Sequence, residues 1–273
     1  MENLDLPNRS RFEGQSVAWG CIGNGDPLVM IHGTPFSSQV WRNIAPHLAT
    51  RRKVYFFDLL GYGQSEQKDG QDVSLGVQNR LLAHLLREWD IETPSVLCHD
   101  FGAATALRGY FLNGLRYRDI TIFDAVALAP WGTPFAQHVR HYEQAFAGMP
   151  AYAHNAMLAA YLQSAAFNVL SAEVLALHSD PWRGAVGQPA FYRQIAQFDQ
   201  AFTDEIEPSY GPIDCPVQIL WGEHDTWLPV SQGRKLADLM TSGRIRIVPG
   251  AGHLLQEDAP EAIVAAMLDP SWS

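Results

Sequence analysis

Short continuous apolar runs recur along the chain, and segments with helical periodicity lie between them. A run without polar alternation predicts a strand that is buried on both faces of a sheet. We expect such strands at residues 16–19, 28–31, 54–57, 95–98, 120–128, 217–221 and 245–248. Helices are expected to begin near 37, at 72–74 and at 102, with further helices at 232–240 and 260–268. This alternation predicts an α/β fold with a mostly parallel, doubly covered sheet.

Residues 132–210 break the alternation. Helical patterns occur there at 142–146, 153–167, 173–177 and 191–202, without a convincing strand pattern. We therefore expect a helical cap inserted after the strand at 120–128. The predicted core comprises residues 1–131 and 211–273, and the predicted cap comprises residues 132–210.

The strand at 95–98 leads into a turn flanked by small residues. In Ser95-Val-Leu-Cys-His-Asp-Phe-Gly-Ala-Ala104, Cys98 and Gly102 stand two positions before and two positions after Asp100. A strand, a tight turn and a helix with this flanking form a nucleophile elbow, which lifts its central side chain at the carboxyl end of the sheet. The central side chain here is Asp100, where serine is usual.

An aspartate at this position predicts a particular chemistry. An unperturbed Asp has a pKa of about 3.9, so Asp100 is ionised at neutral pH and needs no base to attack an sp3 carbon that bears a leaving group. The resulting ester must then be hydrolysed. We expect His253 as the base for water and Asp225 as the acid that orients it, with the backbone N–H groups of Phe101 and Thr34 as the oxyanion hole.

Five motifs together carry a family resemblance. They are His32-Gly-Thr-Pro35, Gly61-Tyr-Gly-Gln-Ser65, the elbow, Gly222-Glu-His-Asp225 and Gly250-Ala-Gly-His253. With the order nucleophile, acid, histidine, the chain resembles an α/β-hydrolase over nearly its whole length. The His-Asp-x-Gly elbow resembles the aspartate-nucleophile branch, which contains epoxide hydrolases, haloalkane dehalogenases and fluoroacetate dehalogenases.

Within this branch, the resemblance to epoxide hydrolases implies two cap tyrosines that protonate the opening oxygen. Gln188-Pro-Ala-Phe-Tyr-Arg193 resembles the second of their cap motifs, which identifies Tyr192. Tyr161 is the expected first tyrosine, with Tyr152 as the second choice. Epoxide hydrolysis to a vicinal diol is therefore the leading prediction.

The resemblance to dehalogenases is weaker at two positions. Haloalkane dehalogenases usually have Trp after the nucleophile and often Asn where this chain has Thr34, whereas Phe101 has no donor to offer a halide. Trp131 or Trp182 could supply one indole donor. Fluoroacetate dehalogenases usually have Arg in place of Phe101. A haloalkane or haloacid dehalogenase with the same triad thus remains the alternative. A catalytically silent ligand-binding relative is the second alternative, and a lyase or cofactor-free oxygenase ranks below it.

Composition narrows the environment and the partners. The chain has 273 residues, 47% of them hydrophobic, and a net charge of −10, which argues against nucleic acid and anionic membranes as partners. Three widely spaced cysteines and the lack of an apolar segment of about 18 residues indicate a cytoplasmic protein with reduced thiols. The histidines of the cap lack ligand spacing, so no metal or cofactor is expected.

The expected substrate is a small apolar organic molecule, bound by a monomer or a homodimer. The residues expected around it are His32, Phe36, Trp131 and Tyr152. One further carboxylate, Asp124, falls inside the predicted strand at 120–128, and we interpret it as structural.

Overall fold

The computed structural model describes residues 2–269 of the chain. Its centre is an eight-stranded sheet in the order β1-β2-β4-β3-β5-β6-β7-β8. The strands are β1 Asn8–Phe12, β2 Gln15–Ile22, β3 Asp26–Ile31, β4 Arg52–Phe57, β5 Ser95–His99, β6 Asp119–Phe123, β7 Val217–Gly222 and β8 Arg246–Val248. β2 pairs antiparallel with β1 and with β4, and the other neighbours are parallel, so the predicted mostly parallel sheet is confirmed.

Helices cover both faces of this sheet. Every residue of β5 and the last four residues of β3 and of β6 are therefore buried. The core helices are η1 Ser38–Trp41, α1 Ala45–Leu48, α2 Leu75–Glu88, α3 Phe101–Asn113, α9 Val230–Met240, α10 Leu255–Asp258 and α11 Pro260–Leu268. Helix α2 packs against α3, and α1 packs against α11.

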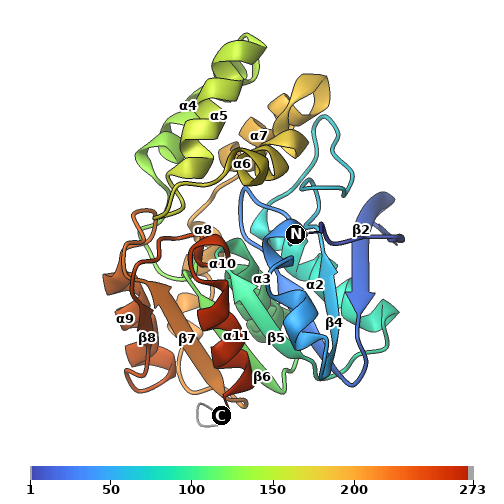
Figure 1. Cartoon of the computed structure of the whole chain (residues 1–273), viewed down its shortest axis with the longest axis vertical. Coiled ribbons are helices and arrows are strands. Elements are labelled where there is room, and N and C mark those ends of the chain that lie inside the picture. The colour runs from blue at the N-terminus through green and yellow to red at the C-terminus, as the bar shows by residue number, and fades with distance from the viewer. Residues whose placement is uncertain (1, 270–273) are drawn as a thin grey trace.

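A helical insert separates β6 from β7, as the sequence predicts. It contains α4 Pro134–Ala147, α5 Ala151–Gln163, α6 Ala172–Ser179, η2 Asp180–Trp182 and α7 Gly184–Ala196. Two short helices, α8 Ala201–Asp204 and η3 Glu207–Ser209, lead back to the sheet. Figure 1 shows α4 to α7 as a separate layer at one end of the core. The boundaries at 132 and 210 stay a prediction.

Several predicted elements differ from the observed ones; the helix expected at 142–146, for example, is α4, which begins at Pro134. β6 ends at Phe123 because Asp124 adopts φ 43°, which is incompatible with extended backbone, so Asp124 follows the strand and does not lie inside it. The segment after 37 forms two short helices, η1 and α1, in place of one. Helix α7 starts at Gly184 in a run of small residues that has little apolar periodicity, well before the predicted start at 191.

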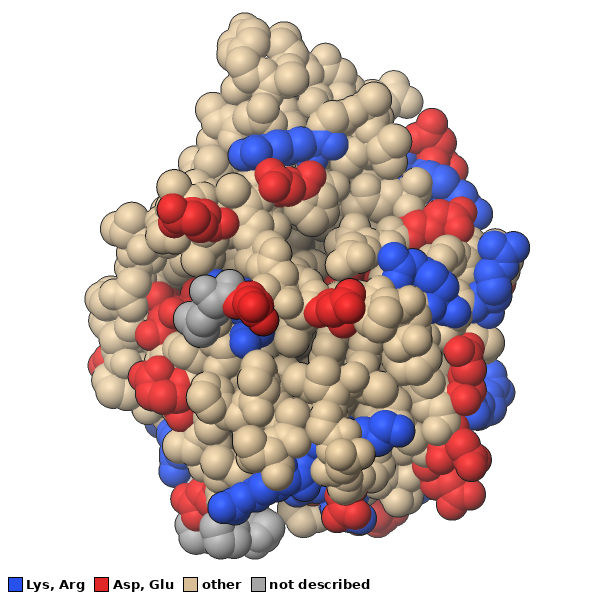
Figure 2. Space-filling model, turned by 45° about the vertical axis from the view of Figure 1, so that its right-hand side comes forward, with Lys and Arg blue, Asp and Glu red and all other residues tan. Residues whose placement is uncertain are grey.

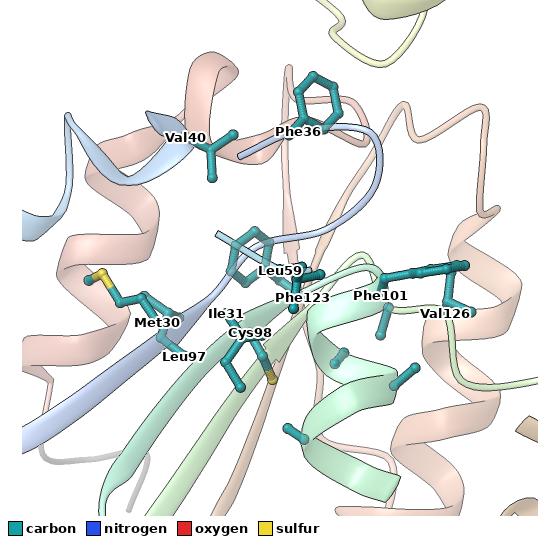
Figure 3. Packing of buried hydrophobic residues seen from close by; sticks show 14 of the residues in the cluster. Met30, Ile31, Phe36, Val40, Leu59, Leu97, Cys98, Phe101, Phe123 and Val126 are labelled. Atoms are coloured by element: carbon teal, nitrogen blue, oxygen red, sulfur yellow. The ribbon is translucent and has the colours of Figure 1, made fainter. Parts of the chain in front are cut away.

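Apolar packing fixes the strand ends below the turn at Asp100. Met30, Ile31, Leu97, Cys98 and Phe123 come from three neighbouring strands and are fully buried (Figure 3). Burial of each large apolar side chain contributes about 1.5–3 kcal/mol. The carboxyl ends of β3, β5 and β6 are therefore held in a fixed relation to one another, which is a condition for a precise site at this edge.

Charged side chains are scattered over the surface. On the face shown in Figure 2, acidic and basic residues are interspersed, and the central part is mostly uncharged. Over residues 2–269, no helix combines the length and apolar character needed to cross a membrane. The same residues contain no group of three or more His, Cys, Asp or Glu side chains arranged to hold a metal ion.

Candidate active site

Asp100 occupies the sharp turn between β5 and α3. Its backbone angles of φ 50° and ψ −117° lie outside the regions that non-glycine residues usually adopt. Two glycines permit this turn: a Cβ on Gly33 would lie 2.4 Å from the Cβ of Asp100, and a Cβ on Gly102 would lie 2.1 Å from the carbonyl oxygen of Ile31. The strained backbone of Asp100 costs about 1–3 kcal/mol and persists only where the surrounding structure enforces it.

The two carboxylate oxygens of Asp100 have different surroundings. Oδ1 accepts a hydrogen bond of 2.7 Å from the backbone N–H of Thr34. Oδ2 lies 3.5 Å from Nε2 of His253, whose Nδ1 lies 3.0 Å from Oδ2 of Asp225. The three side chains expected to form a triad thus meet at one edge of the sheet, in the order Asp100, His253, Asp225.

Backbone donors hold Asp225 in position. Its Oδ1 accepts hydrogen bonds of 2.8 Å from the backbone N–H groups of Trp227 and Leu228. Its Oδ2 is therefore turned to the imidazole of His253. A carboxylate fixed in this way selects the tautomer of a histidine and stabilises the imidazolium form.

His253 is buried between aromatic and polar groups. The indole of Trp227 stacks on the imidazole with a centroid separation of 5.0 Å. On the other side, Nε2 of His99 lies 3.0 Å from the carbonyl oxygen of His253. Burial alone would lower the pKa of His253, but the negative charges of Asp225 and Asp100 and the hydrogen bonds to them raise it well above its ordinary value. The imidazolium form is favoured while both carboxylates are ionised.

A second carboxyl group, that of Asp124, lies behind the triad. Its Oδ1 accepts a hydrogen bond of 2.8 Å from the backbone N–H of Gly222, and its Oδ2 has no partner among the described residues. Asp124 is fully buried, and burial together with the nearby charge of Asp225 raises its pKa well above the ordinary value. The charged form of Asp124 is therefore disfavoured relative to that of an exposed aspartate.

A small cavity of about 30 Å³ opens in front of Asp100. Its walls are mostly apolar and come from both the core and the cap. They are formed by Thr34, Asp100, Phe101, Val126, Trp131, Gly132, Thr133, Tyr161, Phe198, Trp227 and Leu228. A small, largely apolar cavity with few polar groups is typical of a site for a small organic molecule.

Tyr161 is the cap tyrosine that lines this cavity. Burial raises its pKa above the ordinary value, and the charge of Asp100 raises it further, while a hydrogen bond with Thr133 offsets part of the increase. The phenol therefore stays protonated at neutral pH. It offers an O–H donor on the cap side of the carboxylate.

Tyr192, the other expected cap acid, lies elsewhere. Its hydroxyl is 2.7 Å from Nδ1 of His154, and both side chains are buried within the cap. It does not line the cavity, so the prediction that it faces the substrate is wrong. Tyr152, the second choice for the first tyrosine, is 79% exposed and is likewise remote from a substrate.

Of the other residues expected around the substrate, only Trp131 lines the cavity. His32 is a scaffold residue, since its Nε2 accepts a hydrogen bond of 2.9 Å from the backbone N–H of Leu59. Phe36 is buried against His178, with a centroid separation of 5.2 Å, and does not reach the cavity wall. The predicted roles of His32 and Phe36 are therefore wrong.

The indole N–H groups near the site are already engaged. Trp131 donates to Oγ1 of Thr203 at 2.8 Å, and Trp182 donates to the carbonyl oxygen of Pro35 at 2.6 Å. The indole of Trp227 also donates outside the cavity, to the hydroxyl of Ser164 at 3.0 Å. None of these three donors is free for a halide.

Two residues beside the site were not predicted from the sequence. Gln194 of α7 and Tyr62 of the core meet next to Thr34. The hydroxyls of Thr34 and Tyr62 both donate to Oε1 of Gln194. Gln194 stands two positions after Tyr192, on the same helix. Its polarity in a mostly apolar helix was the available signal.

The fold and the site place the chain in a known family. The model of the α/β-hydrolase family matches residues 28–266, and the chain belongs to that family. Its expected fold, a mostly parallel sheet with an inserted helical cap, is thereby confirmed.

Similar proteins include a haloalkane dehalogenase and an epoxide hydrolase. A haloalkane dehalogenase of Sphingobium indicum is 27% identical over 287 aligned residues, which cover 94% of this chain and 92% of that protein. A crystal structure of an α/β-hydrolase fold protein from Burkholderia ambifaria is 56% identical, with a TM-score of 0.97 and coverage of 98% and 99% of the two chains. The epoxide hydrolase CorEH shares the fold, with 21% identity, a TM-score of 0.74 and coverage of 96% of each chain.

Proposed function

We propose that this protein hydrolyses small apolar epoxides to vicinal diols through a covalent ester on Asp100. The observation that carries the proposal is the placement of Asp100. Its Oδ2 faces His253, its Oδ1 is held by the N–H of Thr34, and the carboxylate borders a cavity that also contains the hydroxyl-bearing side chain of Tyr161. This arrangement supplies a nucleophile, a base and an acid around one small apolar space.

In the first step, a carboxylate oxygen of Asp100 attacks an epoxide carbon. The carbon–oxygen bond of the ring breaks, its electron pair passes to the oxygen, and Tyr161 gives this oxygen its proton. An ester and a tyrosinate result. Because the pKa of Tyr161 is raised, the phenol is present in its acid form at the start of this step.

In the second step, His253 takes a proton from water, and the hydroxide adds to the ester carbonyl carbon. The backbone N–H groups of Thr34 and Phe101 would stabilise the oxyanion. When the intermediate collapses, the alkoxide of the diol takes the proton from His253, and the carboxylic acid of Asp100 returns a proton to the tyrosinate. The net reaction consumes one water and restores every residue.

The charge around His253 supports this order of events. While Asp100 is ionised, its charge helps to hold the pKa of His253 above the ordinary value. Esterification removes that charge, so the pKa of His253 falls and the imidazolium releases its proton to solvent, which leaves a neutral imidazole able to accept a proton from water; the imidazolium takes a proton back from solvent once the carboxylate of Asp100 is restored. The base is thereby made available only after the ester has formed.

Carbon–halogen hydrolysis on the same triad is the second candidate. The name of the Sphingobium indicum relative favours it. The donors in the cavity favour the epoxide, since the indoles of Trp131, Trp182 and Trp227 are engaged and Phe101 has no side-chain donor. A hydroxyl that can transfer a proton, as on Tyr161, serves an epoxide oxygen but is not required by a departing halide.

The test is intact-protein mass spectrometry of His253→Gln, in which the ester should form and persist. We expect the mass of an aryl epoxide to be added whole, with no adduct on a His253→Gln, Asp100→Asn double variant. Replacing Tyr161 by Phe should slow this adduct by about 100-fold or more.

An alkyl adduct from a bromoalkane, with none from epoxides, would favour the dehalogenase. If a broad panel of both substrate types gave no adduct, the nucleophile itself would be refuted, and a ligand-binding or lyase role would take precedence.

A further inference from the structure

A buried histidine, His99, connects the nucleophile to the base. It is the last residue of β5, directly before Asp100, and it is fully buried. Its Nε2 lies 3.0 Å from the carbonyl oxygen of His253. Because a carbonyl oxygen can only accept a hydrogen bond, Nε2 of His99 carries the hydrogen and donates it. One side chain therefore ties the turn that bears Asp100 to the backbone of His253.

The imidazole of His99 is held in place by its neighbours. It stacks on the ring of Phe123 with a centroid separation of 5.0 Å and an interplanar angle of 24°. The ring of His253 lies 4.8 Å away, tilted by 48°. His99 and Phe123 are also register partners in the pairing of β5 with β6. The N–H donor is thus presented to His253 from the sheet, the most rigid part of the fold.

The base depends on its backbone for its position. His253 follows the glycine-containing turn at 250–252 and precedes α10, which begins at Leu255, so it belongs to no helix or strand. At the ring, Nδ1 is held by Asp225 at 3.0 Å, whereas Nε2 lies 3.5 Å from Oδ2 of Asp100, which is long for a hydrogen bond. A shift of this backbone segment would therefore move Nε2 away from the carboxyl group that carries the ester.

His99 makes this connection without adding a charge. Burial and the nearby positive charge of His253 lower the pKa of His99 to about 3, although the charge of Asp100 opposes part of the decrease. The ring is therefore neutral at neutral pH, and its Nδ1 has no hydrogen-bond partner among the described residues. A cationic His99 would interact with the carboxylate of Asp100 and would lower the basicity of His253. A neutral donor avoids both effects.

We propose that His99 is a positioning residue for ester hydrolysis, which holds His253 at its working distance from Asp100 through the hydrogen bond to the carbonyl oxygen of His253. This role deepens the proposed function and rests on it. His99 is not among the residues that line the cavity, so it acts through His253 and not on the substrate.

The proposal predicts that the two chemical steps respond differently. Formation of the ester needs the carboxylate of Asp100 and the proton of Tyr161, whereas hydrolysis needs His253 as the base. Displacing a catalytic group by about 1 Å can cost about 100-fold in rate. Loss of the donor on His99 should therefore slow hydrolysis and let the ester accumulate. A general distortion of the turn would slow formation as well, because Asp100 is the next residue.

The experiment compares His99→Met with His99→Gln in otherwise wild-type protein. The two side chains have similar lengths, but only Gln keeps an N–H donor near the position of Nε2. Protein in excess is mixed with an aryl epoxide and quenched, and intact mass against time gives the rates at which the ester appears and disappears. In His99→Met we expect hydrolysis to slow by about 100-fold, with formation within about threefold of wild type. His99→Gln should restore hydrolysis to within about tenfold of wild type.

The matched control is His154→Met. His154 is also buried, and its Nε2 also donates to a backbone carbonyl oxygen, that of Trp182 at 2.8 Å, but within the cap. This variant loses the same kind of hydrogen bond without affecting the segment that carries His253. It should form and hydrolyse the ester at the wild-type rates.

Two outcomes would overturn this role. Hydrolysis at the wild-type rate in His99→Met would show that the hydrogen bond does not position the base. Equal slowing of formation and hydrolysis in both variants would assign His99 to the structure of the turn. If His99→Met did not fold, His99→Asn would replace it, since its N–H2 group is one bond too short to reach the carbonyl oxygen; a wild-type rate of hydrolysis in that variant would also refute the role. Absence of any ester in His253→Gln would refute the proposed function itself, which is a distinguishable result.

Discussion

Two of the buried places where the cap meets the core use opposite chemistry. At α6, Nε2 of His178 lies 2.8 Å from Oε1 of Glu257, and Arg42 donates to the other oxygen of Glu257 at 2.7 Å. At α7, neutral groups meet: the amide of Gln194 and the hydroxyls of Thr34 and Tyr62. We call these the ionic junction and the neutral junction.

The difference follows from distance to the nucleophile. No member of the ionic junction lines the cavity, whereas the neutral junction includes Thr34, which is bonded to Asp100. A fixed charge next to Asp100 would change the reactivity of its carboxylate, and the same charge elsewhere only holds two elements together. Behind the triad, burial and the nearby charge of Asp225 raise the pKa of Asp124 and disfavour its charged form, which fits the same pattern.

The largest expected effect distinguishes Asp225 from Asp124, the two carboxyl groups behind His253. Asp225→Asn should slow hydrolysis of the ester by about 10⁴-fold, because the wrong tautomer of His253 is then favoured. Asp124→Asn should change it by less than about threefold, since an amide resembles a neutral carboxyl. Single-turnover kinetics of both variants measure this. Equal losses would show that Asp124 is ionised and shares the role of Asp225.

The next effect tests the ionic junction. Glu257→Ala leaves the guanidinium of Arg42 buried without its partner, which typically costs about 3–5 kcal/mol. Chemical denaturation measures this loss. Glu13→Ala, which breaks an exposed pair with Arg80, is the matched control and should cost less than about 1 kcal/mol. A similar small loss for both would remove the distinction between a buried and an exposed charge pair.

The ionic junction should also weaken in acid. Burial alone would raise the pKa of Glu257, but hydrogen bonds from His178 and Arg42 lower it from 4.5 to about 2. The unfolded chain therefore takes up the proton first, so this stabilisation is complete above pH 4.5 and is lost as the pH falls toward 2. It amounts to about 3 kcal/mol. Unfolding free energies of wild type and Glu257→Gln should converge over this range, and parallel curves would contradict the assignment.

The smallest effect concerns the pH dependence that Asp124 imposes. Because burial raises its pKa in the folded state, the unfolded chain loses the proton first, and stability falls as the pH rises above 3.8. Asp124→Asn lacks this loss. Its Tm should match that of wild type near pH 4 and exceed it at pH 7, as measured by calorimetry. If the variant were as stable as wild type at pH 4 but less stable than wild type at pH 7, the carboxyl of Asp124 would be charged in the folded protein.

The sequence predicted the core of the site better than its cap. Asp100, Asp225 and His253 each follow a strand, and parallel strands end at one edge of a sheet, so their meeting follows from topology. Only the position of Asp124 was mispredicted, because its φ of 43° ends β6 early, which no apolar pattern records.

The site residues of the cap are harder to predict, because the rotation of a helix about its axis decides which of its side chains face the core. Tyr192 and Gln194 are two residues apart, which places them about 200° apart around α7. The predicted helix began seven residues late, so its spacing could not tell which of the two faces the core. Tyr192 faces His154 inside the cap, and Gln194 faces Thr34.

The central claim is that Asp100 forms a covalent ester, and single turnover in ¹⁸O-labelled water tests it most directly. With wild-type enzyme in excess over an aryl epoxide, the first diol should carry unlabelled oxygen from Asp100. The peptide that contains Asp100 should gain one ¹⁸O atom. Label in the first diol, with none in this peptide, would mean that water attacks the substrate directly and would contradict the account.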